Sequence, residues 1–327
     1  MAKRVLSGMQ PSGLMHVGNL FGALDNFKRL QTDHECFYFI ADWHALSTNY
    51  EDTARIREYA REMLVDWLAA GLDPERSTLF IQSRVPEHAI LHLLLSMITP
   101  VSWLERNPTY KEKQENIEGR DLSTYGFLGY PVLQTADILL YKGDFVPVGV
   151  DQLPHLELSR EIARRFNMLY RPVFPEPQAL LTEIPKVPGT DGRKMSKSYN
   201  NTINLSDDEP TVRAKLKTMV TDPARIRRTD KGNPEICPVF TLHKSISAQP
   251  VIDQVNRECR TAAIGCIDCK KILADGLVTL LTPTWEKRRE LAQKPKFVDE
   301  VIDAGTRKAG AVAAKTISEV SEAIRVG

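Results

Sequence analysis

The sequence has almost no net charge and no long apolar run, and both absences narrow the possible functions. Its 43 Lys and Arg residues nearly balance 42 Asp and Glu, so the formal net charge of +1 does not indicate a nucleic-acid partner. No N-terminal apolar segment is long enough for secretion or for crossing a membrane. The chain also has no internal repeat and no low-complexity tract. We therefore expect a cytoplasmic protein without a membrane partner.

Composition and apolar pattern indicate an α/β protein. With 327 residues, 42% of them hydrophobic, the chain can bury a sizeable core and contain two domains. Up to about Val101, short apolar runs alternate with longer helical patterns, which is typical of a parallel sheet covered by helices. A helix is predicted over residues 53–70, ended by Gly71. Strands are predicted over residues 4–7, 36–41 and 78–82.

Two short motifs far apart in the sequence carry groups suited to a triphosphate. Residues 192–198 read Gly-Arg-Lys-Met-Ser-Lys-Ser, whose ammonium and hydroxyl groups can stabilise charge spread over phosphoryl oxygens. Residues 8–19 read Gly-Met-Gln-Pro-Ser-Gly-Leu-Met-His-Val-Gly-Asn and lie between a strand pattern and a helical one, and a helix N-terminus attracts anions. A glycine-rich turn alone could be merely a tight connection. Together, the two motifs predict a nucleotide site.

These motifs give the chain a resemblance to the class I aminoacyl-tRNA synthetases, whose nucleotide-binding motifs are called HIGH and KMSKS. The match consists of His16-Val17-Gly18-Asn19 and of residues 194–198. Residues 10–13 (Gln-Pro-Ser-Gly), 41–45 (Ala-Asp-Trp-His-Ala) and 135–141 (Thr-Ala-Asp-Ile-Leu-Leu-Tyr) are similar to the bacterial tryptophanyl branch. The resemblance implies activation of L-tryptophan with ATP and Mg²⁺, giving tryptophanyl-adenylate and pyrophosphate. Transfer of tryptophan to the 3′ end of tRNA(Trp) would follow.

The resemblance also implies a domain organisation. Residues 1–200 would form a Rossmann-like catalytic domain, in which a helical insertion at about 102–169 builds the interface of a homodimer. Residues 201–327 would form an all-α domain that binds the tRNA anticodon, and the pattern after Leu205 is helical to the end. The positions expected to be buried in the last helix are Val298, Val301, Ile302, Val312, Ile317, Val320 and Ile324.

By resemblance, the ATP site draws residues from both motifs and from two further segments. Lys194, Lys197, His16 and Gln10 would be the catalytic members. Val150 stands where glutamate is usual in the family, so a ribose contact there would use backbone or Asp151. The expected ATP-binding residues are Gln10, Pro11, Ser12, Gly18, Asn19, Gly149, Val150, Asp151, Val187, Lys194, Met195, Ser196, Lys197 and Ser198.

The amino-acid pocket is expected on one helix face, because Tyr130, Gln134 and Asp137 are spaced at i, i+4 and i+7. By resemblance, Asp137 accepts a hydrogen bond from the indole N–H and so rejects side chains lacking that donor. Tyr130 and Gln152 would contact the ammonium group, and His44 and Ile40 would line the pocket. The ordinary alternatives are a surface aspartate on an amphipathic helix and a core histidine.

Three other functions compete with tryptophan ligation. The tyrosyl branch also uses a Tyr-x-x-x-Gln-x-x-Asp face, and many tryptophanyl enzymes have Met where this chain has Gln134. Residues 10–13 and 42–45 favour tryptophan over tyrosine. A non-catalytic relative that binds adenylate or RNA would not need the intact lysines, and small-molecule adenylyltransferases lack the long helical C-terminal region.

Four of the five cysteines are gathered in the C-terminal half. A Cys-x-x-Cys pair with two further cysteines, in a chain expected to be cytoplasmic, indicates a metal centre rather than disulfides. Zinc and a 4Fe-4S cluster both suit four thiolates, and scattered buried thiols are the ordinary alternative. A subset of the bacterial tryptophanyl enzymes has a similar pattern that binds 4Fe-4S, with a first gap one residue longer, which favours the cluster. The expected ligands are Cys237, Cys259, Cys266 and Cys269.

Two groups of basic residues in this half are solvated charged faces unless the family resemblance makes them RNA contacts. They are Arg225, Arg227, Arg228 and Lys231, and Lys287, Arg288, Arg289, Lys294 and Lys296.

Overall fold

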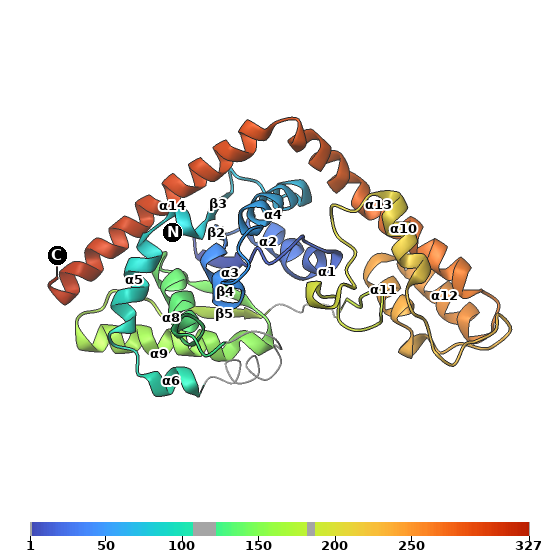
Figure 1. Ribbon diagram of the computed structural model, residues 1–327, viewed down its shortest axis with the longest axis horizontal. Coiled ribbons are helices and arrows are strands. Elements are labelled where there is room, and N and C mark those ends of the chain that lie inside the picture. The colour runs from blue at the N-terminus through green and yellow to red at the C-terminus, as the bar shows by residue number, and fades with distance from the viewer. Residues whose placement is uncertain (1, 107–121, 182–186, 327) are drawn as a thin grey trace.

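A five-stranded parallel sheet forms the centre of the computed structural model, which describes residues 2–106, 122–181 and 187–326 (Figure 1). The strand order is β3-β2-β1-β4-β5. The first three strands lie within two residues of their predicted bounds. The strands are β1 (Arg4–Met9), β2 (Glu35–Ile40), β3 (Ser77–Ile81), β4 (Phe145–Val148) and β5 (Gln178–Leu181).

The strand order places a change of direction beside β1. The chain passes from β1 to β2 and β3 on one side, then crosses back to β4 and β5 on the other. Val5 of β1 is paired with Cys36 of β2 and with Phe145 of β4. In open parallel sheets, ligands bind at the carboxyl ends of the strands where the order reverses. The topology therefore predicts a site between the ends of β1 and β4.

Helices cover both faces of the sheet because alternate residues of each strand point to opposite sides. In β2, Tyr38 and Ile40 face a core with α2 and α4, whereas Phe37 and Phe39 face a core with α5, α8 and α9. The helices of this part are α1 (Val17–Asn19), α2 (Asp25–Leu30), α3 (Asp42–Asn49), α4 (Ile56–Ala70), α5 (Glu87–Ser96), α6 (Val101–Glu105), α8 (Tyr125–Leu140) and α9 (Leu153–Leu169).

Short turns of other helix types join these elements. A π-helical stretch continues α1 into α2, and 3₁₀ turns follow β3, precede α9, and begin at Lys197 and Pro234. They span Leu20–Leu24, Gln82–Arg84, Val150–Gln152, Lys197–Tyr199 and Pro234–Ile236.

Helix α4 matches its prediction, beginning at Ile56 and ending at Ala70. Gly71 has φ of 105°, a left-handed conformation that stops the helix at low cost for glycine. The buried side of α4 includes Trp67, which packs edge-on against Phe27 of α2 with ring centroids 6.2 Å apart. This packing connects α4 to the core beneath the glycine-rich turn.

The expected insertion at 102–169 is only partly separate from the sheet. Residues 107–121 lie outside the described part of the chain. The same range contains β4, which pairs directly with β1, and α8 and α9, which cover one face of the sheet. The range 102–169 thus contributes a strand to the sheet as well as helices, and its part in a dimer interface stays a prediction.

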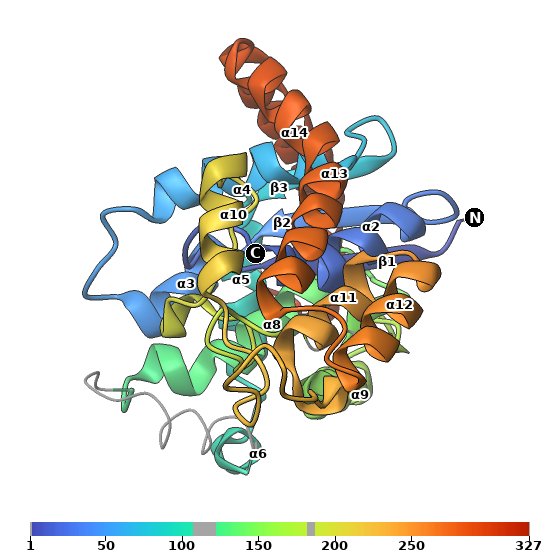
Figure 2. The same ribbon diagram turned by 90° about the vertical axis from the view of Figure 1, so that its right-hand side faces the viewer.

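The C-terminal part is helical, but it is neither continuous nor confined to one place. Residues 219–233 form an irregular segment between α10 and α11, which corrects the prediction of helix from Leu205 to the end. Figures 1 and 2 show α10, α11 and α12 grouped beside α13, whereas α14 returns to the sheet. The helices are α10 (Glu209–Thr218), α11 (Pro238–Ile246), α12 (Gln249–Arg260), α13 (Cys266–Ala292) and α14 (Pro295–Ile324).

Helix α14 packs against the edge strand β3 at very short range. A Cβ added to Gly305 would lie 1.8 Å from the carbonyl oxygen of Leu79, so only glycine permits this approach. Among the expected buried positions, Val298, Val301, Ile302 and Val320 are buried, while Val312, Ile317 and Ile324 are half-buried. None of the helices in the described residues has the length and apolar character required to span a bilayer.

Candidate active site

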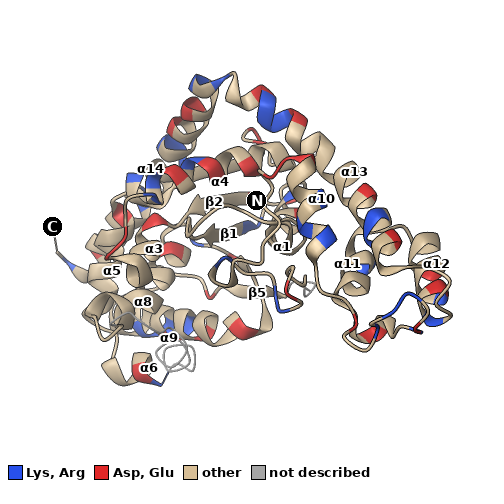
Figure 3. Ribbon diagram, turned by 45° about the vertical axis from the view of Figure 1, so that its right-hand side comes forward, with Lys and Arg blue, Asp and Glu red and all other residues tan. Residues whose placement is uncertain are grey.

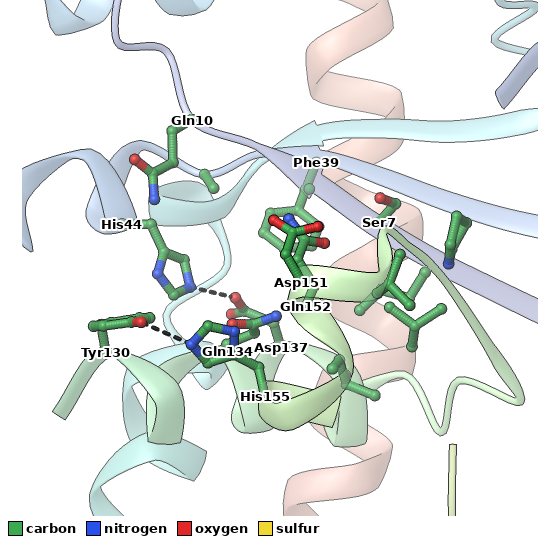
Figure 4. Close-up of a pocket in the computed structure, with 17 residues that line it drawn as sticks. Ser7, Gln10, Phe39, His44, Tyr130, Gln134, Asp137, Asp151, Gln152 and His155 are labelled. Carbon is green, nitrogen blue, oxygen red and sulfur yellow. Dashed lines mark hydrogen bonds and ion pairs between the residues drawn. The ribbon is translucent and has the colours of Figure 1, made fainter. Parts of the chain in front are cut away.

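A cavity of about 390 Å³ opens at the carboxyl ends of β1 and β4, where the topology predicts a site (Figure 4). Side chains from three strands, from α8 and from the start of α9 form its walls. The residues that line it are Leu6, Ser7, Gly8, Gln10, Phe39, Ala41, His44, Tyr130, Gln134, Asp137, Ile138, Val146, Pro147, Val148, Asp151, Gln152 and His155.

Helix α8 brings Tyr130, Gln134 and Asp137 to this cavity, as their spacing predicted. Asp137 is 1% exposed, which excludes the alternative of a surface aspartate. Its Oδ2 accepts a hydrogen bond from His44 Nε2 at 2.8 Å. Burial alone would raise the pKa of Asp137, but hydrogen bonds from His44 and His88 outweigh it and hold the pKa below the usual value. A fixed carboxylate therefore lies at the cavity wall.

The tyrosine and glutamine positions complete the polar wall. Tyr130 Oη lies 2.7 Å from His155 Nε2, and Figure 4 shows both rings beside Gln134. Burial raises the pKa of Tyr130, so its hydroxyl is un-ionised at neutral pH. Gln152 also lines the cavity. His155 was not predicted from the sequence; the available signal is a histidine in the first turn of the helix that follows Gln152.

Ile40 does not line this cavity, contrary to the prediction. It belongs to the core on the opposite face of the sheet, with Val5 and Tyr38. Its neighbours Phe39 and Ala41 form the wall instead. The reason is the two-residue period of a strand, which turns successive side chains to opposite faces.

His16 lies at the start of α1, where its backbone N–H donates to Asn19 Oδ1 at 3.1 Å. The imidazole is buried, and burial followed by the charge of Lys197 lowers its pKa to about 4. His16 is therefore neutral at pH 7. A Cβ added to Gly18 would lie 3.0 Å from the His16 ring, so the glycine keeps space beside it. The turn thus offers neutral donors and backbone N–H groups.

The two distant motifs meet through Lys197. Its Nζ donates to the carbonyl oxygen of Gly13 at 2.9 Å, and Gly13 has φ of 142°. Burial lowers the pKa of Lys197 to about 8, against the opposing effect of the Asp66 carboxylate. Lys194, by contrast, is exposed at the outer side of the loop. Lys197 thus joins the loop to the glycine-rich turn, and the shared nucleotide site stays a prediction.

Asn201 stabilises the conformation of the loop through its side-chain amide. Its buried amide Nδ2 donates to Asp191 Oδ1 at 2.7 Å and to the Lys194 carbonyl at 3.2 Å, and its Oδ1 accepts from the Ser196 N–H at 2.8 Å. A Cβ on Gly189 would meet the Asn201 side chain at 2.3 Å. The role of Asn201 was not predictable from the sequence, because an asparagine after a loop has many ordinary roles.

Other expected ATP-binding residues are placed differently from one another. Asp151 lines the cavity, whereas Val150 is 72% exposed and Met195 is buried in the core. The Met195 side chain is therefore unavailable to a nucleotide, and its N–H already donates to the Val187 carbonyl at 2.9 Å. The remaining members on the turn and the loop are exposed or half-buried, except for buried Pro11; they are Gln10, Pro11, Ser12, Asn19, Ser196 and Ser198. Gly149, before the 3₁₀ turn that precedes α9, and Val187 are both buried.

The four C-terminal cysteines lie near one another around α11, α12 and the start of α13. Burial raises the pKa of the Cys269 thiol to about 12, and the charges of Cys237, Cys259 and Cys266 add to the effect. A Cβ on Gly232 would lie 2.6 Å from Cys259 Sγ. Within residues 2–106, 122–181 and 187–326, no three His, Cys, Asp or Glu side chains are arranged to hold one metal ion.

The two basic groups prove to be partly internal. Arg225 is buried and donates to the carbonyls of Arg228 and Ile264, at 3.2 and 2.5 Å. Arg288 of α13 pairs with two acids of α4, Asp66 and Glu62. Figure 3 shows acidic and basic residues interspersed along α13 and α14. Neither group, taken whole, is a free basic surface.

Comparisons with known proteins agree with the geometry. A sequence model of the family described as "tRNA synthetases class I (W and Y)" matches residues 2–282. A tryptophan-tRNA ligase of Thermotoga maritima is 54% identical, with 99% of each chain covered, and one of Aquifex aeolicus is 46% identical, with 99% of this chain and 100% of the relative covered. The crystal structure of the tryptophanyl-tRNA synthetase of Campylobacter jejuni complexed with ADP and tryptophan superposes with a TM-score of 0.89 at 34% identity. It covers 99% of this chain and 100% of its own.

Proposed function

The chain belongs to the class I tRNA synthetases for tryptophan and tyrosine, and from this premise we propose how it ligates tryptophan to tRNA. It activates L-tryptophan with ATP, giving tryptophanyl-adenylate and pyrophosphate, and then transfers tryptophan to the 3′ end of tRNA(Trp). The observation that carries the proposal is the buried Asp137 carboxylate at the wall of a cavity beside the glycine-rich turn. Such a group selects a side chain that carries one buried N–H donor.

In this proposal, the indole ring enters the cavity and its N–H donates to Asp137 Oδ2. Phe39 and Ala41 supply apolar contact, while Gln152 and Tyr130 face the ammonium group. Leaving a buried carboxylate without its donor costs more than losing an apolar contact, so analogues lacking the N–H are rejected. Tyrosine ligation is the second candidate, because Gln134 occupies the middle position of a Tyr-x-x-x-Gln-x-x-Asp face that the tyrosyl branch shares.

The ATP would lie across the strand ends, with adenine near His16 and Gly18 and the triphosphate between the turn and residues 194–198. The tryptophan carboxylate attacks the α-phosphorus, a new oxygen–phosphorus bond forms, and pyrophosphate leaves as the magnesium complex. Lys197 and Lys194 offset the charge that develops on the departing phosphates. Because the substrate itself is the nucleophile, the protein contributes positioning and electrostatics.

We further propose that Cys237, Cys259, Cys266 and Cys269 hold a 4Fe-4S cluster. Support comes from the mutual proximity of the thiols and from Arg225, whose Nη1 lies 3.7 Å from Cys259 Sγ. The thiols do not fit one ion as they stand, and a cubane cluster needs wider spacing because each thiolate binds its own iron. When bound, the cluster would fasten the start of α11 to α12 and α13.

Anaerobic purification tests the cluster directly. Brown protein containing iron and sulfide in equal amounts is expected. Colourless protein with stoichiometric zinc would reject the cluster in favour of the zinc alternative.

The C-terminal helices α10–α13 would bind the tRNA anticodon arm.

A second copy of the chain would complete a homodimer. Ile90, Leu93 and Met97, at i, i+3 and i+7 along α5 and its C-cap, form an exposed apolar row. A second copy seated there would cover this row. Light scattering should give twice the chain mass, and monomer at micromolar concentration would contradict the dimer.

Because tRNA charging serves translation, we place the protein in the cytoplasm.

Exchange of labelled pyrophosphate into ATP tests the activity. Exchange that depends on tryptophan, and that tyrosine does not support, is expected. Exchange with tyrosine alone would favour the tyrosyl candidate, and no exchange with either amino acid would favour a non-catalytic relative.

A further inference from the structure

The two oxygens of the Asp137 carboxylate are used by different parts of the protein. Oδ2 is contacted by His44, which lines the cavity. Oδ1 accepts from Gln82 Nε2 at 2.8 Å and from His88 Nδ1 at 2.6 Å, and neither of these residues lines the cavity. One oxygen is therefore hydrogen-bonded to a residue of the cavity wall and the other to a buried polar cluster behind it.

His88 is held in a single orientation by its own partners. Its side chain is fully buried on α5, and its Nε2 lies 2.8 Å from the hydroxyl of Tyr141, which is also fully buried. A carboxylate can only accept, so Nδ1 carries the proton toward Asp137 and we assign the Tyr141 hydroxyl as the donor to Nε2. The rings of Phe39 and Phe80 lie 5.8 and 6.1 Å from the imidazole centroid. The ring has no room to turn away.

We propose that His88 is a positioning residue for amino-acid selection. With Gln82, it saturates Oδ1 of Asp137 and so fixes the rotation of the carboxylate, leaving Oδ2 as the acceptor for the substrate ring N–H. Tyr141 acts one step further out by orienting the imidazole. This inference rests on the proposed function, since it assigns the origin of the selectivity of the same cavity. The general reason is that a residue contacting the substrate is positioned only as precisely as the neighbouring residues that hold its side chain.

The test compares tryptophan with its benzothiophene analogue, in which sulfur replaces the ring N–H. The measured quantity is the ratio of kcat/KM for the two amino acids in pyrophosphate exchange. In His88→Phe, which keeps a ring but loses both hydrogen bonds, the ratio should fall roughly tenfold, corresponding to about one charge-assisted hydrogen bond. In Tyr141→Phe the ratio should fall about threefold, because the neutral hydrogen bond that is lost joins Tyr141 to His88 and not to Asp137 itself.

Tyr38→Phe is the matched control, because it also removes one buried tyrosine hydroxyl. That hydroxyl donates to the Phe27 carbonyl at 3.2 Å on the opposite face of the sheet. Its ratio should stay at the unmodified value. Equal losses for tryptophan and the analogue in His88→Phe and Tyr141→Phe would mean a merely structural role and would overturn the inference.

The milder variant keeps the test decisive. If His88→Phe does not fold, an unchanged ratio in folded Tyr141→Phe still rejects the inference, and a reduced ratio supports it. Failure of the proposed function looks different, since the unmodified protein would then show no tryptophan-dependent exchange at all.

Discussion

The amino-acid cavity and the nucleotide loop are built in opposite ways. The cavity lies at the carboxyl ends of β1 and β4, and its Asp137 carboxylate is held by buried donors from three elements. In the loop, Lys197 donates to the carbonyl oxygen of Gly13 in the glycine-rich turn, while Lys194 is exposed. A rigid buried acceptor suits selection of one side chain. An accessible cationic loop suits a cosubstrate that enters as ATP and leaves as pyrophosphate.

Lys197→Ala is expected to give the largest difference between the effect on the nucleotide loop and the effect on the amino-acid cavity. Removing the cation that faces the departing phosphates should slow adenylate formation by about a hundredfold or more, while tryptophan affinity changes little because the cavity is untouched. Stopped-flow measurement of adenylate formation and equilibrium binding of tryptophan give the two numbers. Lys194→Ala is the matched comparison, with a smaller expected loss. Equal losses in both measurements would count against the assigned role of Lys197.

The converse change is Asp137→Asn, which keeps the size of the side chain but removes its charge. Loss of a charge-assisted hydrogen bond should lower kcat/KM for tryptophan by about ten- to a hundredfold, whereas the KM for ATP should stay near its original value. Pyrophosphate exchange at varied tryptophan and varied ATP separates the two. A change confined to ATP would mean that the cavity does not hold the indole.

A pH profile of the unmodified protein should reveal the ionisation of Lys197. Lys197 is positively charged below its pKa, and burial lowers that pKa to about 8. The kcat/KM for ATP, which reports the free protein, should therefore decline above pH 8 and approach a tenfold loss per pH unit. The kcat/KM profile of Lys197→Arg should stay flat through this range, because arginine keeps its proton. An unchanged decline in that variant would assign the titration to another group.

The smallest effect is expected from Asn201→Ala, which leaves both lysines in place. Losing the buried amide that joins Asp191, Lys194 and Ser196 should lower kcat/KM for ATP by about fivefold, on the order of one net hydrogen bond. Tryptophan binding measured by calorimetry should be unaltered. Weakened tryptophan binding would show that the loop and the cavity are coupled after all.

Much of the active site could be predicted from local pattern. The i, i+4, i+7 spacing of Tyr130, Gln134 and Asp137 placed them on one face of α8, because helical geometry alone decides which residues share a side. The same kind of reasoning failed for Ile40. A one-residue error along a strand reverses the face, and sequence alone did not say which face of β2 would meet the cavity.

Several groups that could not be predicted have partners distant in the chain. Arg288 looked like a member of a basic surface, but it pairs with buried Asp66 of α4. His88 carried no signal, since its partners Asp137 and Tyr141 come from a different helix. Gly305 likewise gave no hint that α14 would return to β3.

The amino-acid sequence by itself determined the parallel-sheet architecture, the two nucleotide motifs and the helix face that carries Asp137, because periodicity, glycine positions and charge act over a few neighbouring residues. The tertiary structure alone decided which lysine reaches the turn, which oxygen of Asp137 faces the cavity and where the last helix lies. Those outcomes depend on packing between segments far apart in the chain, where small differences in distance decide which polar groups meet.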